Sequence, residues 1–169
     1  ALQRLLVAIP NWVGDVVMAT PVLAALRAHL AQTQITYLMR PYVAEIVAGC
    51  GWHDAEVFWP TARGAPGLVE NLALGRSLRR PRFDVALLLT NSFRSGLIAW
   101  QAGARRRIGY ARDGRSWLLT DRLRPLKERG RFVPSPVLPY YIRLAEHLGC
   151  PVTDRRLRLG LTPAQDEAG

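Results

Sequence analysis

The sequence predicts an α/β fold in which an open, mainly parallel β-sheet carries helices on both faces. Segments with the apolar pattern of strands alternate with segments of helical spacing, which indicates βαβ units. The strand predicted at residues 83–90 contains an uninterrupted apolar run from Val85 to Leu89, and such runs are typical of strands buried on both faces. Of the 169 residues, 49% are apolar, so the chain can bury one hydrophobic core and form one compact domain.

Strands and helices alternate regularly through the first half of the chain. Pro10 ends the first strand, Gly49 ends the second helix, and a loop that contains glycine and proline precedes the third helix. Pro21 is either the first helical residue after Thr20 or a kink in a helix that begins near Asp15. The predicted elements are strands at 3–9, 34–39, 55–59 and 83–90, and helices at 16–30, 41–48 and 68–80.

The second half of the chain continues the alternation with weaker signals. Gly103 and Gly149 mark the ends of two further helices, and the alternating residues 155–161 resemble an edge strand. The predicted elements are a helix at 94–102, a strand at 106–110, a weak segment at 116–119, a helix at 140–148 and a strand at 155–161. Residues 1–161 therefore form the predicted domain, and residues 162–169 are predicted to be a linker.

Composition limits the classes of function. The chain has 23 basic and 13 acidic residues, a formal net charge of +10, and all of its basic residues except Lys127 are arginine. This bias indicates either an acidic partner, which guanidinium groups suit, or a genome that encodes arginine wherever lysine would serve. Cys50 and Cys150 are too few and too far apart for a disulfide framework or a thiolate metal site, which favours a reducing compartment.

The apolar stretch at residues 5–26 is not predicted to span a membrane. Asn11 and Asp15 lie near its middle, where a charge costs roughly 2.5 to 3.5 kcal/mol, and Pro10 and Pro21 interrupt it. We therefore expect a soluble, cytoplasmic protein. The three histidines lack the spacing of metal ligands, so no metal site is predicted.

Two loops that follow predicted strands, at residues 10–15 and 90–93, are the candidate binding loops. Ligands of open parallel sheets bind beyond the carboxyl ends of the strands, so these loops should line one crevice. The first loop has neither the dinucleotide fingerprint nor a phosphate-binding loop. It does carry Asp15 after Gly14, near a helix start that favours the ionised carboxylate. Asp15 can act as a base toward a sugar hydroxyl, or it can cap the helix.

The order of several short motifs resembles one enzyme family. The motifs are Trp12-Val13-Gly14-Asp15 with Thr20-Pro21, then Asn91-Ser92-Phe93-Arg94-Ser95, then Arg107-Ile108-Gly109-Tyr110 with Arg115 and Leu118-Leu119-Thr120-Asp121, and finally Tyr140-Tyr141. In this order and spacing they resemble the ADP-heptose:lipopolysaccharide heptosyltransferases of glycosyltransferase family 9, and most of all the heptosyltransferase II branch. The likeness covers nearly the whole chain.

The resemblance implies a fold and a reaction. Members of the family are inverting GT-B glycosyltransferases with two Rossmann-like domains, and this chain resembles the N-terminal one, which binds the lipopolysaccharide inner-core acceptor. Asp15 would be the general base, and ADP-heptose would be held by a C-terminal donor-binding domain that this chain lacks. No metal or other cofactor is implied. The isolated chain is then expected to be inactive, with peripheral contact at the inner membrane.

Further residues are expected to bind the acceptor. Asn91, Ser92 and Arg94 offer hydrogen bonds and one charge, which suit a phosphorylated, acidic sugar, although Asn91 and Ser92 can equally cap a helix. Trp12 can stack on a sugar ring or be buried beneath the sheet. The complete set of predicted acceptor-binding residues is Asn11, Trp12, Gly14, Asn91, Ser92 and Arg94, with Arg63 and Arg107 as lesser candidates for acceptor phosphates or Kdo carboxylates.

The alternative function is a non-enzymatic, arginine-rich module that binds nucleic acid through phosphate contacts. Such modules usually place aromatic side chains among their basic residues. The basic clusters at residues 79–82 and 105–107 contain no aromatic residue. We therefore expect no nucleic-acid partner.

Overall fold

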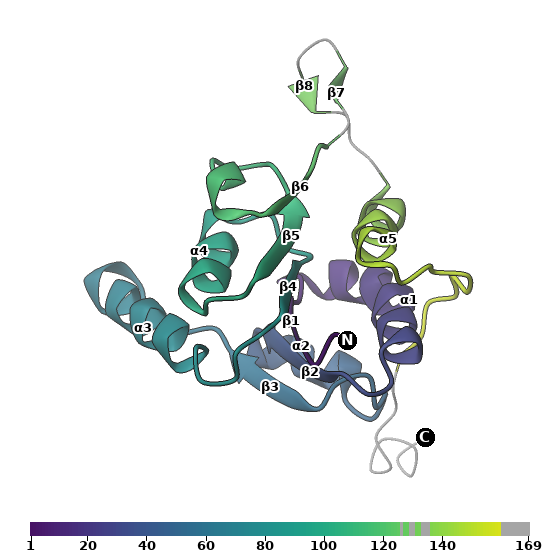
Figure 1. The fold of residues 1–169 in the computed structure, drawn as a ribbon, viewed down its shortest axis with the longest axis horizontal. Helices are drawn as coiled ribbons and strands as arrows, with labels where there is room; N and C mark the ends of the chain where they lie inside the picture. Colours follow the sequence, from purple (N-terminus) through teal and green to yellow (C-terminus); the bar gives the residue numbers. More distant parts are fainter. Residues whose placement is uncertain (126, 129–130, 133–135, 160–169) are drawn as a thin grey trace.

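The computed structural model describes residues 1–125, 127–128, 131–132 and 136–159. Its centre is a six-stranded parallel sheet with the strand order β3-β2-β1-β4-β5-β6 (Figure 1). This is the order of a doubly wound, Rossmann-like sheet, in which the chain winds outward first on one side of β1 and then on the other. The predicted fold class is confirmed.

The elements follow the predicted alternation, with small shifts at their ends. The strands of the main sheet are β1 (Arg4–Ala8), β2 (Gln34–Met39), β3 (Ala55–Phe58), β4 (Val85–Leu88), β5 (Arg106–Tyr110) and β6 (Asp121–Leu123). The helices are α1 (Val13–His29), α2 (Pro41–Val47), α3 (Gly64–Ser77), α4 (Phe93–Gln101) and α5 (Val137–Leu148), with a 3-10 turn, η1 (Ser116–Leu118). A small antiparallel hairpin joins β7 (Lys127–Glu128) to β8 (Arg131–Phe132).

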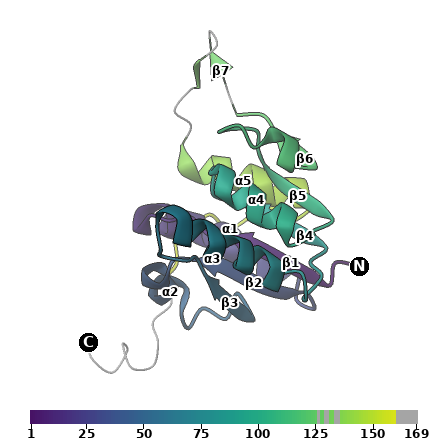
Figure 2. The ribbon, with the colours of Figure 1, turned by 90° about the vertical axis from the view of Figure 1, so that its left-hand side faces the viewer.

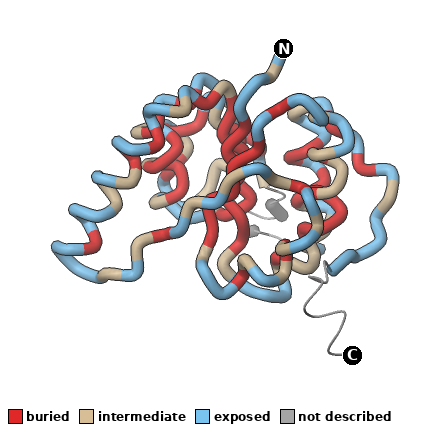
Figure 3. Tube along the Cα trace, turned by 90° about the horizontal axis from the view of Figure 1, so that it is seen from below, coloured by how far each residue is buried: buried red, intermediate tan, exposed pale blue. Residues whose placement is uncertain are grey.

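Helices cover both faces of the sheet, as predicted. Helices α1, α2 and α5 lie on one face, and α3 and α4 lie on the other (Figures 1 and 2). Alternate residues of each central strand serve the two faces: in β1, Leu5 and Val7 pack toward α1, while Leu6 and Ala8 pack toward α4. The buried segments accordingly run through the middle of the molecule, with exposed turns around them (Figure 3).

Pro21 lies inside α1, so the helix does not begin at this proline. A proline cannot donate a hydrogen bond to the carbonyl four residues earlier, which here belongs to Val17. The Thr20 hydroxyl donates to that same carbonyl oxygen at 2.7 Å. The sequence therefore provides the replacement donor one residue before the proline, and α1 continues to His29.

The predicted strand at 155–161 is wrong over its described part, because residues 155–159 have no regular secondary structure. Asp154 instead pairs with Arg156 and Arg158, and the Arg158 backbone N–H donates to Thr20 Oγ1 at 3.1 Å. The segment thus follows α1 rather than the sheet edge. The edge is formed by β6, which the sequence analysis did not predict as a strand. The predicted linker at 162–169 lies outside the described residues.

Asp121, on β6, is predicted to make the stability of the fold depend on pH. It accepts hydrogen bonds from Arg106 at 2.6 Å and from Thr120 at 2.8 Å, and His147 Nε2 lies 3.0 Å from it. Partial burial alone would raise the pKa of Asp121, but these hydrogen bonds outweigh it and lower the pKa to about 2. A carboxyl group whose pKa is lowered on folding stabilises the fold above the unfolded pKa, and this contribution disappears as the pH falls through the folded pKa.

Asp121→Asn is therefore expected to lower the free energy of unfolding by about 1 to 2 kcal/mol near pH 6, because the ionised carboxylate is lost. Near pH 2 the expected difference is less than about half of that, because this pH is well below the unfolded pKa and about half of the wild-type carboxylates are then protonated in the folded state. Urea unfolding of both proteins at the two pH values measures the difference. A gap of the same size at both values would contradict the assigned role of Asp121.

Candidate functional site

The cavity that contains the predicted site lies at the switch point of the sheet, where β1 and β4 are neighbours and the chain winds away on either side. It has a volume of about 240 Å³. The loops after the two strands form its walls, and Tyr141 of α5 completes it. The lining residues are Pro10, Asn11, Trp12, Asp15, Leu89, Thr90, Asn91, Ser92 and Tyr141.

Asp15 lies in the first turn of α1 and lines this cavity. The N-cap residue is Trp12, and no side chain caps the helix there. The first backbone N–H groups of α1 lack helical partners, and Asp15 lies among them in the first turn. Asp15 does not occupy the N-cap position that the capping alternative required. Burial raises the pKa of Tyr141, and the nearby Asp15 carboxylate raises it further. The two side chains are therefore close enough to interact electrostatically.

Trp12 is 76% exposed at the cavity, so it is not buried beneath the sheet. Its neighbour Asn11 is held through the backbone, because the Tyr42 hydroxyl donates to the Asn11 carbonyl oxygen at 2.5 Å. Gly14 does not line the cavity, and a Cβ placed on it would meet no atom within 4 Å. Trp12 thus offers an exposed ring to a ligand, whereas Gly14 contributes only backbone.

Two polar atoms of the cavity wall are buried without a hydrogen-bond partner among the described residues. They are Asn11 Oδ1 and Thr90 Oγ1, and Thr90 is 8% exposed. Buried polar atoms in proteins are nearly always paired, so each such exception requires an explanation. Both residues line the cavity, although the two atoms themselves are closed off from solvent.

The loop after β4, at residues 90–93, leads into α4 and also forms part of the cavity wall. Ser92 is the N-cap of α4, and its Oγ accepts a hydrogen bond from the Ser95 N–H at 3.2 Å. Asn91 does not cap the helix: its Oδ1 accepts a hydrogen bond from the Tyr140 hydroxyl at 2.8 Å. Of Asn91 and Ser92, only Ser92 caps the helix, and both residues line the cavity.

Arg115 is fully buried behind this second loop. Its guanidinium donates to the carbonyl oxygens of Tyr110 at 3.0 Å, Thr90 at 2.6 Å and Ser92 at 3.3 Å, and to Ser95 Oγ at 2.9 Å. Burial lowers the pKa of Arg115 to about 10, so the group stays charged near neutral pH. Arg115 therefore joins the carboxyl ends of β4 and β5 to the start of α4.

Three predicted site arginines do not line the cavity. Arg94 donates to Asn71 Oδ1 at 2.8 Å and to the Pro60 carbonyl oxygen at 3.1 Å, with its guanidinium 4.6 Å from the centre of the Trp59 ring. Arg107, near the amino end of β5, donates to the carbonyl oxygens of Leu118 and Ala104. Burial lowers the pKa of both arginines. Arg63 is exposed as the N-cap of α3.

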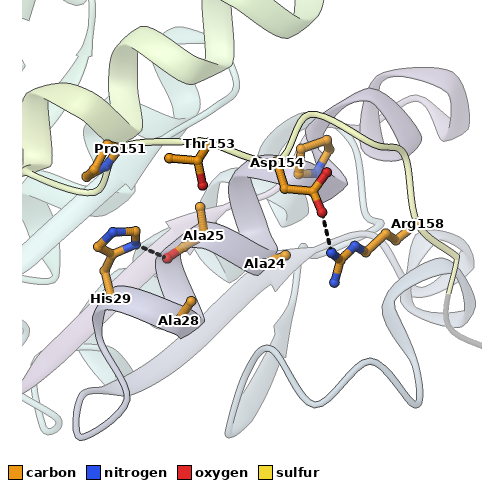
Figure 4. Close-up of a pocket in the computed structure, with 9 residues that line it drawn as sticks. Ala24, Ala25, Ala28, His29, Pro151, Thr153, Asp154 and Arg158 are labelled. Carbon is orange, nitrogen blue, oxygen red and sulfur yellow. Dashed lines mark hydrogen bonds and ion pairs between the residues drawn. The ribbon is translucent and has the colours of Figure 1, made fainter.

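A second hollow, of about 140 Å³, lies between α1 and the segment after α5 (Figure 4). Alanines of α1 form one wall, and Asp154 and Arg158, which pair with each other at 2.5 Å, form the other. None of the predicted site residues lines this hollow. Within the described part of the chain, no three metal-ligating side chains of His, Cys, Asp or Glu cluster, and no helix has the length and hydropathy needed to cross a bilayer.

Sequence reasoning placed Thr90 in a loop that lines the crevice but did not name it as a binding residue, and it missed Leu89 and Tyr141 as cavity residues. It also did not identify the part that Arg115 plays. Tyr141 comes from a helix far along the chain, and no local pattern places it beside Asp15. An arginine in a polar segment is usually exposed, so nothing in the sequence marks Arg115 as buried.

The comparisons with known proteins agree with this architecture. Lipopolysaccharide heptosyltransferase 2 of Escherichia coli (strain K12) is 32% identical to this chain over 119 residues, which cover 70% of this chain and 34% of that enzyme. The structure of E. coli ADP-heptose LPS heptosyltransferase II superimposes with a TM-score of 0.73 at 25% identity, over 98% of this chain and 49% of that one. E. coli heptosyltransferase WaaC with ADP superimposes with a TM-score of 0.65 at 15% identity, over 90% of this chain and 49% of that one.

The match to the curated relative thus covers about a third of that enzyme, and each structural match covers about half of the solved chain. The family model described as glycosyltransferase family 9 (heptosyltransferase) matches residues 71–165, which is more than half of this chain. The chain belongs to glycosyltransferase family 9, the heptosyltransferase family.

Proposed function

We propose that this chain is the acceptor-binding half of an inverting heptosyltransferase that transfers heptose from ADP-heptose to the lipopolysaccharide inner core. The observation that carries the proposal is the position of Asp15, a helix N-terminal carboxylate in a cavity at the switch point of the sheet. Family membership supports the reaction class. A sugar-sized cavity lined in part by polar side chains supports an acceptor sugar as the ligand.

In the proposed reaction, Asp15 acts as the general base. Its carboxylate accepts the proton of an acceptor hydroxyl while that oxygen attacks the anomeric carbon of ADP-heptose. The bond from this carbon to the diphosphate oxygen breaks in the same step, and ADP leaves with the bonding electrons. Attack from the side opposite the leaving group inverts the anomeric configuration. A positioned base typically contributes a factor of about 10² to 10⁴ to such a step.

The remaining polar groups of the cavity would orient the acceptor. Asn91 and Ser92 offer polar side chains in the cavity wall, and the exposed Trp12 ring offers a surface on which a sugar can stack. We propose that the groups that hold the donor diphosphate belong to a further domain, a proposal supported by the matched solved chains, which are about twice as long as this one. We accordingly propose that the chain alone does not transfer heptose and that the reaction uses no bound metal or cofactor.

The proposed place of action is the cytoplasmic face of the inner membrane, where the chain touches the bilayer without crossing it. The net charge of +10 suits the anionic inner core and anionic lipid headgroups. The nucleic-acid alternative is less well supported, because several arginines of the basic clusters are used within the fold. Arg79 donates to the Gln101 carbonyl oxygen, Arg106 pairs with Asp121, and Arg107 donates to two carbonyl oxygens.

Titration of the chain with a deacylated, heptosylated, Kdo-containing oligosaccharide is expected to change its tryptophan fluorescence in a saturable way. The physical reason is that Trp12 is exposed at the cavity and would lose water on binding. Trp12→Phe should remove most of the signal. Trp100→Phe should keep it, because Trp100 of α4 is also exposed but does not line the cavity. Binding of a short oligonucleotide without binding of the oligosaccharide would favour the nucleic-acid alternative.

A further inference from the structure

The side-chain amide of Asn91 is held from one side by two other residues. Its Oδ1 accepts a hydrogen bond from the Tyr140 hydroxyl at 2.8 Å and lies 3.5 Å from Arg115 Nη2. Burial raises the pKa of Tyr140, and the nearby Arg112 guanidinium partly offsets this effect. Tyr140 itself is fixed, because its ring stacks on Tyr110 with 3.6 Å between centroids and its carbonyl oxygen accepts from the Tyr110 hydroxyl at 2.7 Å.

These contacts determine which way the Asn91 amide points. A guanidinium group can only donate hydrogen bonds, so the amide atom that faces Arg115 must be the oxygen. With the oxygen on that side, the Tyr140 hydroxyl donates its proton to the same Asn91 Oδ1. The Asn91 NH2 group is therefore turned away from Arg115 and Tyr140. Since Asn91 lines the cavity, this NH2 group is available to a ligand there.

We propose that Arg115 and Tyr140 are positioning residues that fix the Asn91 amide, so that its NH2 group donates a hydrogen bond to an oxygen of the acceptor sugar in the cavity lined by Asp15. The inference rests on the proposed function for the identity of the ligand. The cavity then contains a fixed donor at Asn91 and an acceptor at Asp15. Such a pair recognises neighbouring sugar hydroxyls, because one hydroxyl can accept while the other donates.

The contacts of Arg115 explain why an arginine is needed at this place. Within the described part of the chain, its hydrogen bonds go to carbonyl, hydroxyl and amide oxygens, and none goes to a carboxylate. The buried positive charge therefore polarises the groups that face it, and a polarised amide oxygen makes its NH2 group a stronger donor. A hydrophobic side chain of similar length could fill the space but could neither orient nor polarise Asn91.

Asn91→Asp separates this role from a role in folding. The replacement keeps an oxygen toward Tyr140 and Arg115 and changes only the cavity-facing NH2 group to an oxygen. The melting temperature of the chain should therefore stay the same or rise, because Arg115 gains a charged partner. The dissociation constant for the deacylated, heptosylated, Kdo-containing oligosaccharide should rise by about 10- to 100-fold, because the donor is lost and a second negative charge enters the cavity.

Tyr140→Phe tests the positioning directly. The nitrogen and proton signals of the Asn91 side-chain amide, assigned by their loss in Asn91→Asp, should shift when the Tyr140 hydroxyl is removed. The dissociation constant for the same oligosaccharide should rise by about 3- to 10-fold. Tyr37→Phe is the matched control, since its buried hydroxyl has no hydrogen-bond partner among the described residues and does not line the cavity. It should change neither the amide signals nor the binding.

Unshifted amide signals in Tyr140→Phe, or wild-type binding by Asn91→Asp, would overturn the inference. The proposed function is tested separately, by whether the wild-type chain binds the oligosaccharide at all. If it does not bind, the proposed function fails, and the amide signals still decide whether Tyr140 fixes Asn91.

Discussion

Asp15→Asn, introduced into an enzyme that joins this chain to a donor-binding half, is expected to slow heptose transfer by a factor of roughly 10² to 10⁴. Asparagine has nearly the size of aspartate but cannot accept the hydroxyl proton. The acceptor cavity should keep its shape, because Trp12 and not Asp15 is the N-cap of α1. Single-turnover rates at saturating ADP-heptose and acceptor measure the chemical step without contributions from binding.

The control for this prediction is the stability of the variant. Loss of one first-turn charge should change the free energy of unfolding by no more than about 1 kcal/mol, so a slow variant would still be folded. Asp15→Glu keeps the carboxylate but moves it, and it should recover part of the rate. Turnover within a few fold of the wild type in Asp15→Asn would show that Asp15 is not the base.

Arg115→Met is expected to cost about 3 to 5 kcal/mol of unfolding free energy, the largest effect on stability that we predict. The substitution leaves the carbonyl oxygens of Thr90, Ser92 and Tyr110 facing an apolar side chain in a buried site. Methionine fills much of the space, so the loss reflects missing hydrogen bonds more than a cavity. Urea unfolding followed by far-ultraviolet circular dichroism measures it.

Arg122→Met is the matched control, because Arg122 lies on β6 and is exposed. Its replacement should change the unfolding free energy by about 0.5 kcal/mol or less. Arg115→Lys should fall between the two, since lysine keeps the charge but lacks the planar fork that reaches several oxygens. A loss below about 1 kcal/mol in Arg115→Met would show that Arg115 does not hold the two loops together.

Most of the fold could be predicted because local pattern and tertiary structure agree over β1 to β5. The misses occur where tertiary contacts decide the outcome. Helix α3 begins at Gly64 rather than at residue 68, inside a segment that was predicted to be a loop because of its glycine and proline. Strand β6 has three residues, too few for a recognisable alternation, and its place is set by pairing with β5. At residues 155–159 the alternation does not produce a strand: all five residues are exposed, and the Arg158 N–H donates to Thr20 of α1 instead of to a strand.

The cavity could be predicted in outline for a topological reason. The loops after β1 and β4 carry Asp15 and Asn91, and parallel strands bring their carboxyl ends to one edge whatever the sequence between them. The direction of individual side chains could not be predicted. Arg94 and Arg107 have the chemistry of ligands for phosphate, yet both are bound to groups within the fold. Arg115, which contacts both neighbouring strand ends, is recognisable only once its burial is known.

The most direct test of the acceptor-site assignment is a crystal structure of this chain with the deacylated, heptosylated, Kdo-containing oligosaccharide bound. We predict that a heptose hydroxyl oxygen lies within about 3 Å of an Asp15 carboxylate oxygen, the distance that proton transfer requires. The Asn91 NH2 group should donate to a neighbouring oxygen of the same sugar. An oligosaccharide bound in the hollow between α1 and residues 151–158, with the cavity at Asp15 left empty, would contradict the assignment.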